Sequence, residues 1–130
     1  MNQPQLIDFP KIQDPRGNLT FFQNSDQIPF DIERVFWTYD VPGGEVRGGH
    51  AFKTQQEVII ALSGAFDVIV INAVGNEERY HLNRSYFGLY LPPNTWRHID
   101  NFSTNALALH VSDQKYDAAD YIRSQKDLPK

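Results

Sequence analysis

The stretch that decides the fold is GEVRGGHAFKTQQEVIIALSG, residues 44–64. Its second half contains the apolar run Glu57 to Leu62, which has the length and the β-branched content of a strand. Such near-continuous runs are typical of strands covered on both faces, as when two sheets pack on each other. In the first half, His50 and Phe52 are two residues apart, so in a strand their side chains lie on one face.

Further strand-like runs lie on both sides of this stretch, separated by Gly and Pro, a pattern that indicates a β-sandwich or barrel. The run Phe66 to Ile71 follows Ser63-Gly64-Ala65, which predicts a tight hairpin with the run before it. The other predicted strands are the apolar N-terminal segment containing Leu6, Ile7, Phe9 and Ile12, then Leu19 to Gln23, Arg34 to Tyr39, Arg79 to Leu82, Phe87 to Leu91 and Ala106 to Val111.

One short helix is predicted near the C-terminus. Asp113 is placed to cap a turn that leads into Tyr116 to Gln125, where Tyr121 and Ile122 form a partial apolar stripe. With 130 residues the chain has room for one domain only. The expectation is a single all-β domain, residues 1–130, with a short C-terminal helix.

Composition narrows the class of partner. The net charge of −4 disfavours a nucleic-acid binder, because neutralising phosphates requires a basic face. Cysteine is absent, so there is no disulfide framework and no thiolate nucleophile or ligand. No apolar stretch is long enough to span a membrane, and the N-terminus lacks the pattern of a signal peptide. A cytoplasmic protein that binds small molecules or other protein subunits is the expectation.

Residues 44–64 resemble the first motif of the cupin family. The matching positions are Gly44, His50, Phe52 in place of a second His, Glu57 and Gly64. A second cupin motif is resembled by Pro92-Pro93-Asn94, Arg97 and Asn101, where Arg97 takes the position of a His. The resemblance implies a jelly-roll barrel, also called a double-stranded β-helix.

Metal-binding cupins hold their metal with two His and a Glu of the first motif and a His of the second. Here Phe52 has no ligand atom and Arg97 is a permanent cation. His50 and Glu57 would be left as a pair, fewer ligands than catalytic metals need. We therefore expect no metal, and we expect Glu57 to hydrogen-bond within the barrel.

The run Arg47-Gly48-Gly49-His50-Ala51-Phe52-Lys53 resembles the RGxHAHK signature of the dTDP-4-keto-6-deoxyglucose 3,4-ketoisomerases, a branch of the RmlC-like cupins. Blocks in the same order extend the resemblance over roughly residues 6–125, among them Asp14-Pro15-Arg16-Gly17, Ile28-Pro29-Phe30, Gly88-Leu89-Tyr90, Asn101-Phe102-Ser103 and Asp120-Tyr121-Ile122-Arg123. The resemblance implies a homodimer, no cofactor, and a dTDP-linked keto sugar as substrate. The apolar N-terminal strand is expected to be exchanged between the subunits, since a small barrel must protect its edge strands.

His50 is the expected catalytic residue. Moving a ketone from C4 to C3 requires removal of the C3 proton, an enediol and reprotonation at C4, and imidazole accepts and donates protons near neutrality. The family has a second His where this chain has Phe52. His50 can serve both neighbouring carbons, and Tyr39 or a water molecule are alternative second proton carriers.

The expected substrate-binding residues are mostly cationic or aromatic. The mouth of the cavity is expected to carry the cations Arg47, Lys53 and Arg97. All three bring positive charge, and the guanidinium of an arginine also presents a planar fork that suits phosphate. The resemblance adds Arg16 to the substrate contacts, and Tyr39 and Trp96 are the aromatic candidates. For Arg16 the alternative is to cap its own turn, and for Trp96 it is a place in the core.

Three functions remain open at this point. The first is a dTDP-4-keto-6-deoxyhexose 3,4-ketoisomerase that supplies sugars for surface polysaccharide. The second is a dTDP-sugar 3,5-epimerase, which shares the fold and the type of substrate. The third is a non-catalytic cupin that binds a sugar nucleotide, in which Phe52 marks the loss of chemistry.

Overall fold

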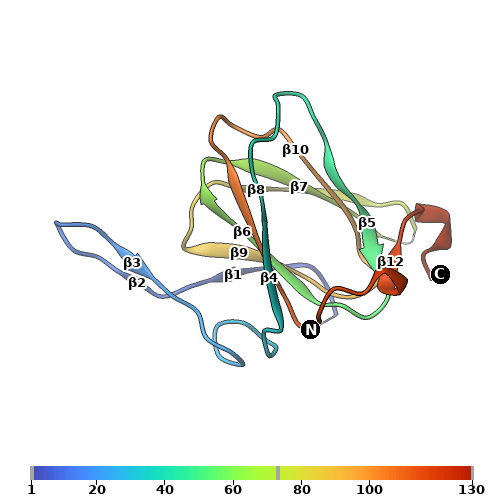
Figure 1. Cartoon of the computed structure of the whole chain (residues 1–130), viewed down its shortest axis with the longest axis horizontal. Coiled ribbons are helices and arrows are strands. Elements are labelled where there is room, and N and C mark those ends of the chain that lie inside the picture. Colours follow the sequence, from blue (N-terminus) through green and yellow to red (C-terminus); the bar gives the residue numbers. More distant parts are fainter. Residues whose placement is uncertain (1, 73, 130) are drawn as a thin grey trace.

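A computed structural model describes residues 2–72 and 74–129 and has two five-stranded antiparallel sheets facing each other (Figure 1). The first sheet has the strand order β1 (Gln5–Asp8), β9 (Phe87–Leu91), β6 (Glu57–Ser63), β11 (Leu107–Ser112), β4 (Arg34–Thr38). The second has the order β12 (Tyr121–Ile122), β5 (Arg47–Phe52), β10 (Trp96–Asp100), β7 (Phe66–Ile71), β8 (Glu77–Leu82). The predicted all-β jelly roll is confirmed.

The main core lies between the two sheets, where the inward residues of each strand alternate with outward ones. It is apolar at one end of the sandwich, and its buried members are Ile59, Ala61, Phe66, Val68, Val70, Leu82, Leu89, Leu91, Ile99, Ala106 and Ala108. The same inner faces continue towards the other end with polar side chains, among them Glu57, Arg97 and His110. Functional groups are therefore expected at this polar end.

Each sheet also has a covered outer face. On the first sheet, Val58 and Ile60 of β6 pack outward against the N-terminal segment, through Phe9, Ile28 and Phe30. On the second sheet, Ala51 and Trp96 pack outward with Ile122, Leu128 and Ile71. Because β6 is covered on both sides, the prediction drawn from its continuous apolar run is confirmed.

The predicted hairpin at Ser63-Gly64-Ala65 is wrong. Strands β6 and β7 flank this turn, but they belong to opposite sheets and do not pair with each other. Gly64 has a φ of +65°, and a Cβ there would lie 2.9 Å from Cα of Ala106. This tightly packed connection leads the chain directly from one sheet to the other.

Two further local predictions differ from the structure. Strand β10 has no counterpart among the strands predicted from the sequence, since the letters WRHID mix apolar and charged residues without clean alternation. The expected helix from Tyr116 to Gln125 is a 3₁₀ turn, Ala118–Asp120, followed directly by β12, and a second 3₁₀ turn covers Gln125–Asp127. Asp117 rather than Asp113 caps the first turn, accepting a hydrogen bond from the backbone N–H of Ala119. No helix of the described ranges has the length and apolar character to cross a membrane.

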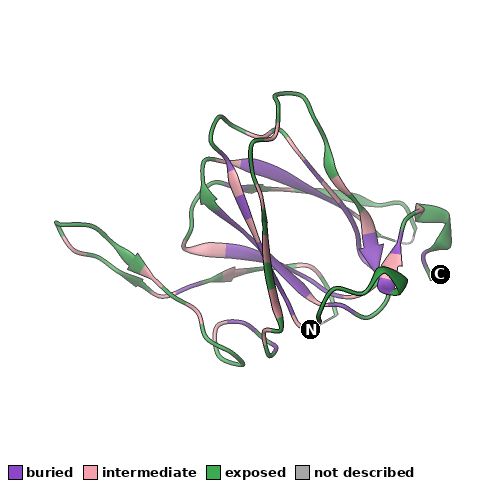
Figure 2. Cartoon of the chain, viewed as in Figure 1, coloured by how far each residue is buried: buried purple, intermediate pink, exposed green. Residues whose placement is uncertain are grey.

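A two-stranded hairpin of β2 (Lys11–Ile12) and β3 (Leu19–Thr20) projects from the sandwich (Figure 1). Most of it is exposed, including the apolar side chains of Ile12 and Leu19 (Figure 2). Strand β1 precedes it and pairs with β9 of the same chain. An exchange of the N-terminal strand between two subunits stays a prediction.

Candidate functional site

A bulge in β5 aims the site's histidine. Strand β5 pairs with β10 through His50 opposite Arg97 and Arg47 opposite Ile99. The interval between these pairs is three residues on β5 but two on β10, so β5 contains one extra residue. Gly48 lies within this bulge and has a φ of +73°, a backbone conformation that would be strained in a residue with a side chain. The bulge places His50 and Phe52 on the inner face of the second sheet, on the same face as Arg97.

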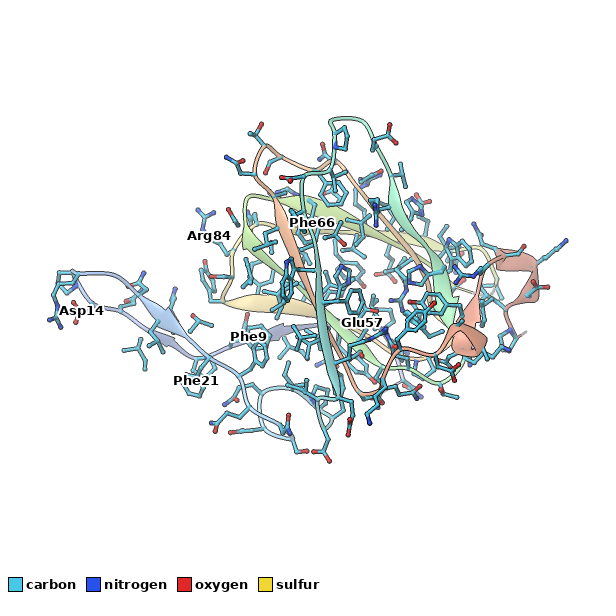
Figure 3. The ribbon with its side chains drawn as sticks, in the orientation of Figure 1. Phe9, Asp14, Phe21, Glu57, Phe66 and Arg84 are labelled. Carbon is cyan, nitrogen blue, oxygen red and sulfur yellow. The ribbon has the colours of Figure 1, made fainter. Side chains whose placement is uncertain are left out.

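A buried ionic group lies beside them and comes from three strands. Glu57 of β6 accepts a hydrogen bond at Oε2 from Nη1 of Arg97 at 2.9 Å, and its Oε1 lies 2.6 Å from Nδ1 of His110. All three residues are almost fully buried, and Glu57 lies between the two sheets (Figure 3). Burying a charge is costly unless it is paired and hydrogen-bonded, and here one carboxylate connects the two sheets through its two partners.

The group continues along the inner face of the first sheet. Nε2 of His110 lies 3.4 Å from Oγ1 of Thr38, and its ring stacks on Phe36 with centroids 4.4 Å apart. Gln55 contacts Oε2 of Glu57 at 3.4 Å and accepts a hydrogen bond of 2.8 Å from Arg34. These contacts hold the imidazole of His110 in one plane and one position.

Two donors of this region lack partners. Nη2 of Arg97 and Nε of Arg34 are buried and have no hydrogen-bond partner among the residues that the structure describes. A buried donor left unpaired costs about 1–3 kcal/mol, more when charged. Nη2 of Arg97, on the residue that pairs with His50, therefore still has a hydrogen bond to donate.

Aromatic rings complete the wall around His50. Its ring lies 4.8 Å from that of Phe52 and 5.2 Å from that of Tyr121, and those two rings are 4.7 Å apart. The guanidinium of Arg97 lies over Phe52 at 5.1 Å, and that of Arg123 lies over Tyr121 at 4.5 Å. His50 is thus partly buried among rings, with two cations nearby.

These surroundings shift the pKa values of His50 and Glu57. Burial and the Arg97 charge lower the pKa of His50 from 6.5 to about 4, although the Glu57 carboxylate opposes them. Burial alone would raise the pKa of Glu57, but Arg97 and His110 outweigh it and lower that pKa from 4.5 to about 2. At neutral pH His50 is therefore an unprotonated imidazole and Glu57 an anion.

The side chains in the cupin ligand positions do not fit a metal. Arg97 places its cation on the carboxylate of Glu57, where a metal ion would have to bind. Phe52 presents a ring, and the described residues contain no group of three or more His, Asp or Glu side chains that suits a metal. The Glu57 interpretation as a hydrogen-bonding residue within the barrel agrees with its two partners.

Three of the expected binding residues are exposed near the ends of β5. Tyr39 and Arg47 line a hollow of about 280 Å³ at the start of the strand. Lys53 lines another of about 450 Å³ at its end, together with Tyr121 and Arg123. Cations are thus present on both sides of His50, in separate hollows.

The other expected contacts lie elsewhere in the single chain. Arg97 was expected at the cavity mouth but is fully buried, because Glu57 holds it inside. Trp96 is next to it on β10 and so faces the opposite side, where it packs with Ala51. Arg16 lies at the tip of the projecting hairpin and pairs with Asp14, which Figure 3 labels, and 90% of its side chain is exposed.

Sequence reasoning missed three residues of the site. His110 alternates with Ala106 and Ala108 in the sequence, which indicates an inward position, but nothing in the sequence pairs it with Glu57. Tyr121 was placed in a helix, although its strand pairs with β5. Arg123 follows on the same segment, and only the ring contact with Tyr121 reveals its place.

The fold is that of a cupin-like protein. Its inner face carries a neutral histidine beside a buried guanidinium, and this arrangement suits proton transfer on an anionic or oxygen-rich small molecule. The chain belongs to the WxcM-like, C-terminal family, since the family model FdtA matches residues 2–130. Membership agrees with the resemblance found in residues 47–53.

Relatives of known activity cover nearly the whole chain. It is 35% identical over 127 residues to the TDP-4-oxo-6-deoxy-α-D-glucose-3,4-oxoisomerase of Aneurinibacillus thermoaerophilus, covering 97% of this chain and 90% of that one. The TDP-quinovose 3,4-ketoisomerase WlaRB of Campylobacter jejuni is 36% identical, with a TM-score of 0.91 and 98% of each chain covered. A variant of the 3,4-ketoisomerase QdtA of Thermoanaerobacterium thermosaccharolyticum, solved with TDP-4-keto-6-deoxyglucose, is 32% identical with a TM-score of 0.93, covering 97% and 91%.

Proposed function

We propose that this protein is a TDP-4-keto-6-deoxyhexose 3,4-ketoisomerase. The observation that carries the proposal is the pairing of His50 with Arg97 on one inner face, where the imidazole is neutral and the guanidinium keeps a free donor. The named activities of relatives that match nearly the full chain support it.

His50 carries the proton between the two carbons. The unprotonated ring takes the proton from C3 of the sugar, which leaves an enediol, and the resulting imidazolium returns a proton to C4. Because C3 and C4 are neighbours, one imidazole between them serves both steps. The pKa of about 4 keeps His50 in the accepting form before each turnover.

Arg97 stabilises the charge that forms on oxygen. When the C3 proton leaves, negative charge collects on the carbonyl oxygen, and a pre-positioned donor lowers the energy of that state. Nη2 of Arg97 is such a donor, since Nη1 and Nε are held by Glu57 and the backbone of Thr95. The ion pair with Glu57 fixes the guanidinium before the substrate arrives.

The diphosphate and the nucleotide need cations outside the inner face. Arg47 and Lys53 are the exposed cations on β5 and its end, and Tyr39 borders the hollow of Arg47. Trp96, on the opposite face of β10, would act by supporting β5 from behind rather than by touching the sugar in the same chain.

The second copy of a homodimer explains the projecting hairpin. Ile12 and Leu19 on the hairpin are more than half exposed, and so is Trp37 on the outer face of the edge strand β4. Apolar surface of this kind is stabilised by burial in an isologous interface. The N-terminal segment is the part of the chain that crosses between subunits in this proposal, and it carries Arg16 to the partner.

The cellular setting follows from the substrate. We propose a cytoplasmic enzyme, where activated nucleotide sugars are made, with a 3-keto product that a later aminating reaction consumes on the way to surface polysaccharide.

The deciding experiment is NMR of the sugar protons in D₂O with TDP-4-keto-6-deoxyglucose as substrate. A 3,4-ketoisomerase converts it to the 3-keto sugar, so the ketone moves from C4 to C3, and deuterium enters C4 in those turnovers in which the His50 imidazolium exchanges with D₂O before it returns the proton. Deuterium at C3 and C5 without movement of the ketone would instead identify a 3,5-epimerase. Binding of TDP without any exchange would identify a non-catalytic binder.

His50→Asn tests the mechanism in the same assay. Asn keeps a polar side chain of similar size but does not titrate near neutrality, so turnover should fall about a hundredfold or more. Affinity for TDP, measured by calorimetry, should stay within about twofold because His50 contacts the sugar only. Full activity of a folded His50→Asn protein would contradict the role of His50.

A further inference from the structure

Ketone transfer moves protons on oxygen as well as on carbon. The oxygen on C4 must gain a proton when the enediol forms, and the hydroxyl on C3 must lose one when the 3-keto product forms. His50 is occupied with the carbon-bound proton, and Phe52 has none to give. A second group on the same inner face is therefore needed, and the inference below rests on the proposed ketoisomerase function.

Tyr121 is brought to that face by strand pairing. In β12 it lies opposite Phe52 of β5, and directly paired residues of antiparallel strands point to the same side of the sheet. Its neighbour Ile122 lies opposite Ala51 and packs into the outer cluster with Trp96. The phenol ring thus shares the inner face with His50, at 5.2 Å between ring centroids.

The strand that carries Tyr121 is firmly held. The carboxylate of Asp120, which is buried, accepts hydrogen bonds from the backbone N–H groups of Thr54 and Gln55 and from the hydroxyl of Thr54. The backbone carbonyl of Asp120 accepts another from N–H of Lys53. These contacts fix β12 to the end of β5, so the phenol is positioned without a ligand.

Cations surround the phenol ring. The guanidinium of Arg123 lies over it at 4.5 Å, and the buried guanidinium of Arg97 lies over the adjoining ring of Phe52. The ring itself is half-buried and borders the hollow that also contains Lys53.

We propose that Tyr121 is a catalytic residue that carries the oxygen-bound proton between O4 and O3 of the sugar. As His50 takes the C3 proton, the phenol donates its proton to O4, which gives the enediol and a phenolate. The phenolate then takes the proton from the O3 hydroxyl while the imidazolium returns its proton to C4. Both protein groups end in their starting forms, so no other reactant is required.

The other tyrosines nearby are less well placed. Tyr39 follows β4 in the same alternation as Trp37, which faces outward, and it is 61% exposed. Tyr116 is 63% exposed, and its ring is 5.9 Å from that of Tyr121. Tyr121 alone among these three pairs directly with β5.

The test uses the full chain and Tyr121→Phe, which keeps the ring contacts and removes only the hydroxyl. We expect kcat to fall about a hundredfold or more, the usual scale for lost acid–base catalysis, with the TDP dissociation constant and the urea midpoint unchanged. Tyr86→Phe is the matched control, because Tyr86 lies against Lys11 of the projecting hairpin, and its kcat should match wild type.

A second readout separates proton transfer from mere positioning. Replacing Tyr121 by a difluorotyrosine keeps the hydroxyl but makes it more acidic, so the basic limb of the kcat profile should move to lower pH. A Tyr121→Phe protein that keeps more than a third of wild-type kcat overturns the inference, as does an unmoved pH profile in the fluorinated protein. A wild-type protein that binds TDP but moves no ketone overturns the proposed function itself.

Discussion

Glu57 is the residue on which the interior of the site depends. It is the carboxylate between Arg97 and His110, and it joins the two sheets where the apolar core gives way to polar side chains. Its pKa of about 2 shows how strongly these partners favour the anion over the acid. Both partners are held in fixed positions as a consequence.

Glu57→Gln should destabilise the fold strongly. The amide leaves Arg97 as a buried cation without a counter-ion, and removing one partner of a buried pair typically costs about 3–5 kcal/mol. The urea midpoint of the variant measures this loss. Asp100→Asn is the matched control, because its 2.9 Å pair with Arg79 is partly exposed, at 26% and 50% of the two side chains, and should change stability by less than about 1 kcal/mol. Equal effects of the two substitutions would contradict the role given to Glu57.

At the scale of the element, the bulge of β5 matters most. Strand side chains alternate, so one extra residue between Arg47 and His50 decides which residues face inward beyond it. Gly48 takes the left-handed conformation that this bulge requires, whereas its neighbour Gly49 has an ordinary backbone.

Gly48→Ala should therefore lower both activity and stability. A φ of +73° is strained in a residue with a side chain, at a cost of about 1 kcal/mol. Relief of that strain would change the backbone of the bulge and so the direction in which the His50 side chain points. We expect kcat to fall at least tenfold while TDP still binds. Gly49→Ala is the control, since its new Cβ would lie 3.8 Å from the Trp96 ring in ordinary contact. Wild-type kcat in Gly48→Ala would show that the bulge does not aim the histidine.

The projecting hairpin is the other informative element. It contributes nothing to the core of its own sandwich beyond its base, and its apolar side chains lie in the open. Phe21, labelled in Figure 3, lies at its foot and is 37% exposed.

The double substitution Ile12→Ser and Leu19→Ser should convert the proposed homodimer to a monomer. Both side chains are more than half exposed in the single chain, so the change removes interface rather than core. Sedimentation velocity at micromolar concentration measures the outcome. Val74→Ser, which removes an 81% exposed apolar side chain from the turn between β7 and β8, should leave the dimer intact. A wild-type monomer would rule the dimer out.

The molecule as a whole is expected to lose stability in acid in two stages. The pKa of His50 is lowered from 6.5 to about 4 on folding, so the unfolded chain binds the proton first and stability falls as pH drops from about 6.5 towards 4. Glu57, lowered from 4.5 to about 2, stabilises the fold above 4.5, and that contribution is lost as pH falls through this lower window.

His50→Asn separates the two stages. Urea midpoints of the variant should change less than those of wild type between pH 7 and pH 4.5, because the group that titrates differently in the two states is gone. Below about pH 4 the two proteins should lose stability in parallel through Glu57. Identical curves above pH 4.5 would contradict the lowered pKa of His50.

Much of this protein follows from its sequence alone. The apolar runs at 57–62 and 66–71 predict strands covered on both faces, and the frame from Gly44 to Gly64 predicts the jelly roll and places His50 on an inner face. Both succeed because alternation within a strand and the spacing within a motif are local properties. The same block at residues 47–53 identifies the family.

Only the tertiary structure decided which distant residues meet. Arg97 faces Glu57 rather than the cavity mouth, His110 shares that carboxylate, and Tyr121 joins β5 through a strand that the sequence pattern presents as helix. Nothing local encodes these contacts, since they join strands up to about 70 residues apart and depend on register. Within each strand the sequence determines which side chains share a face. Which opposing faces meet, and hence which charges pair, is determined by packing the two sheets together.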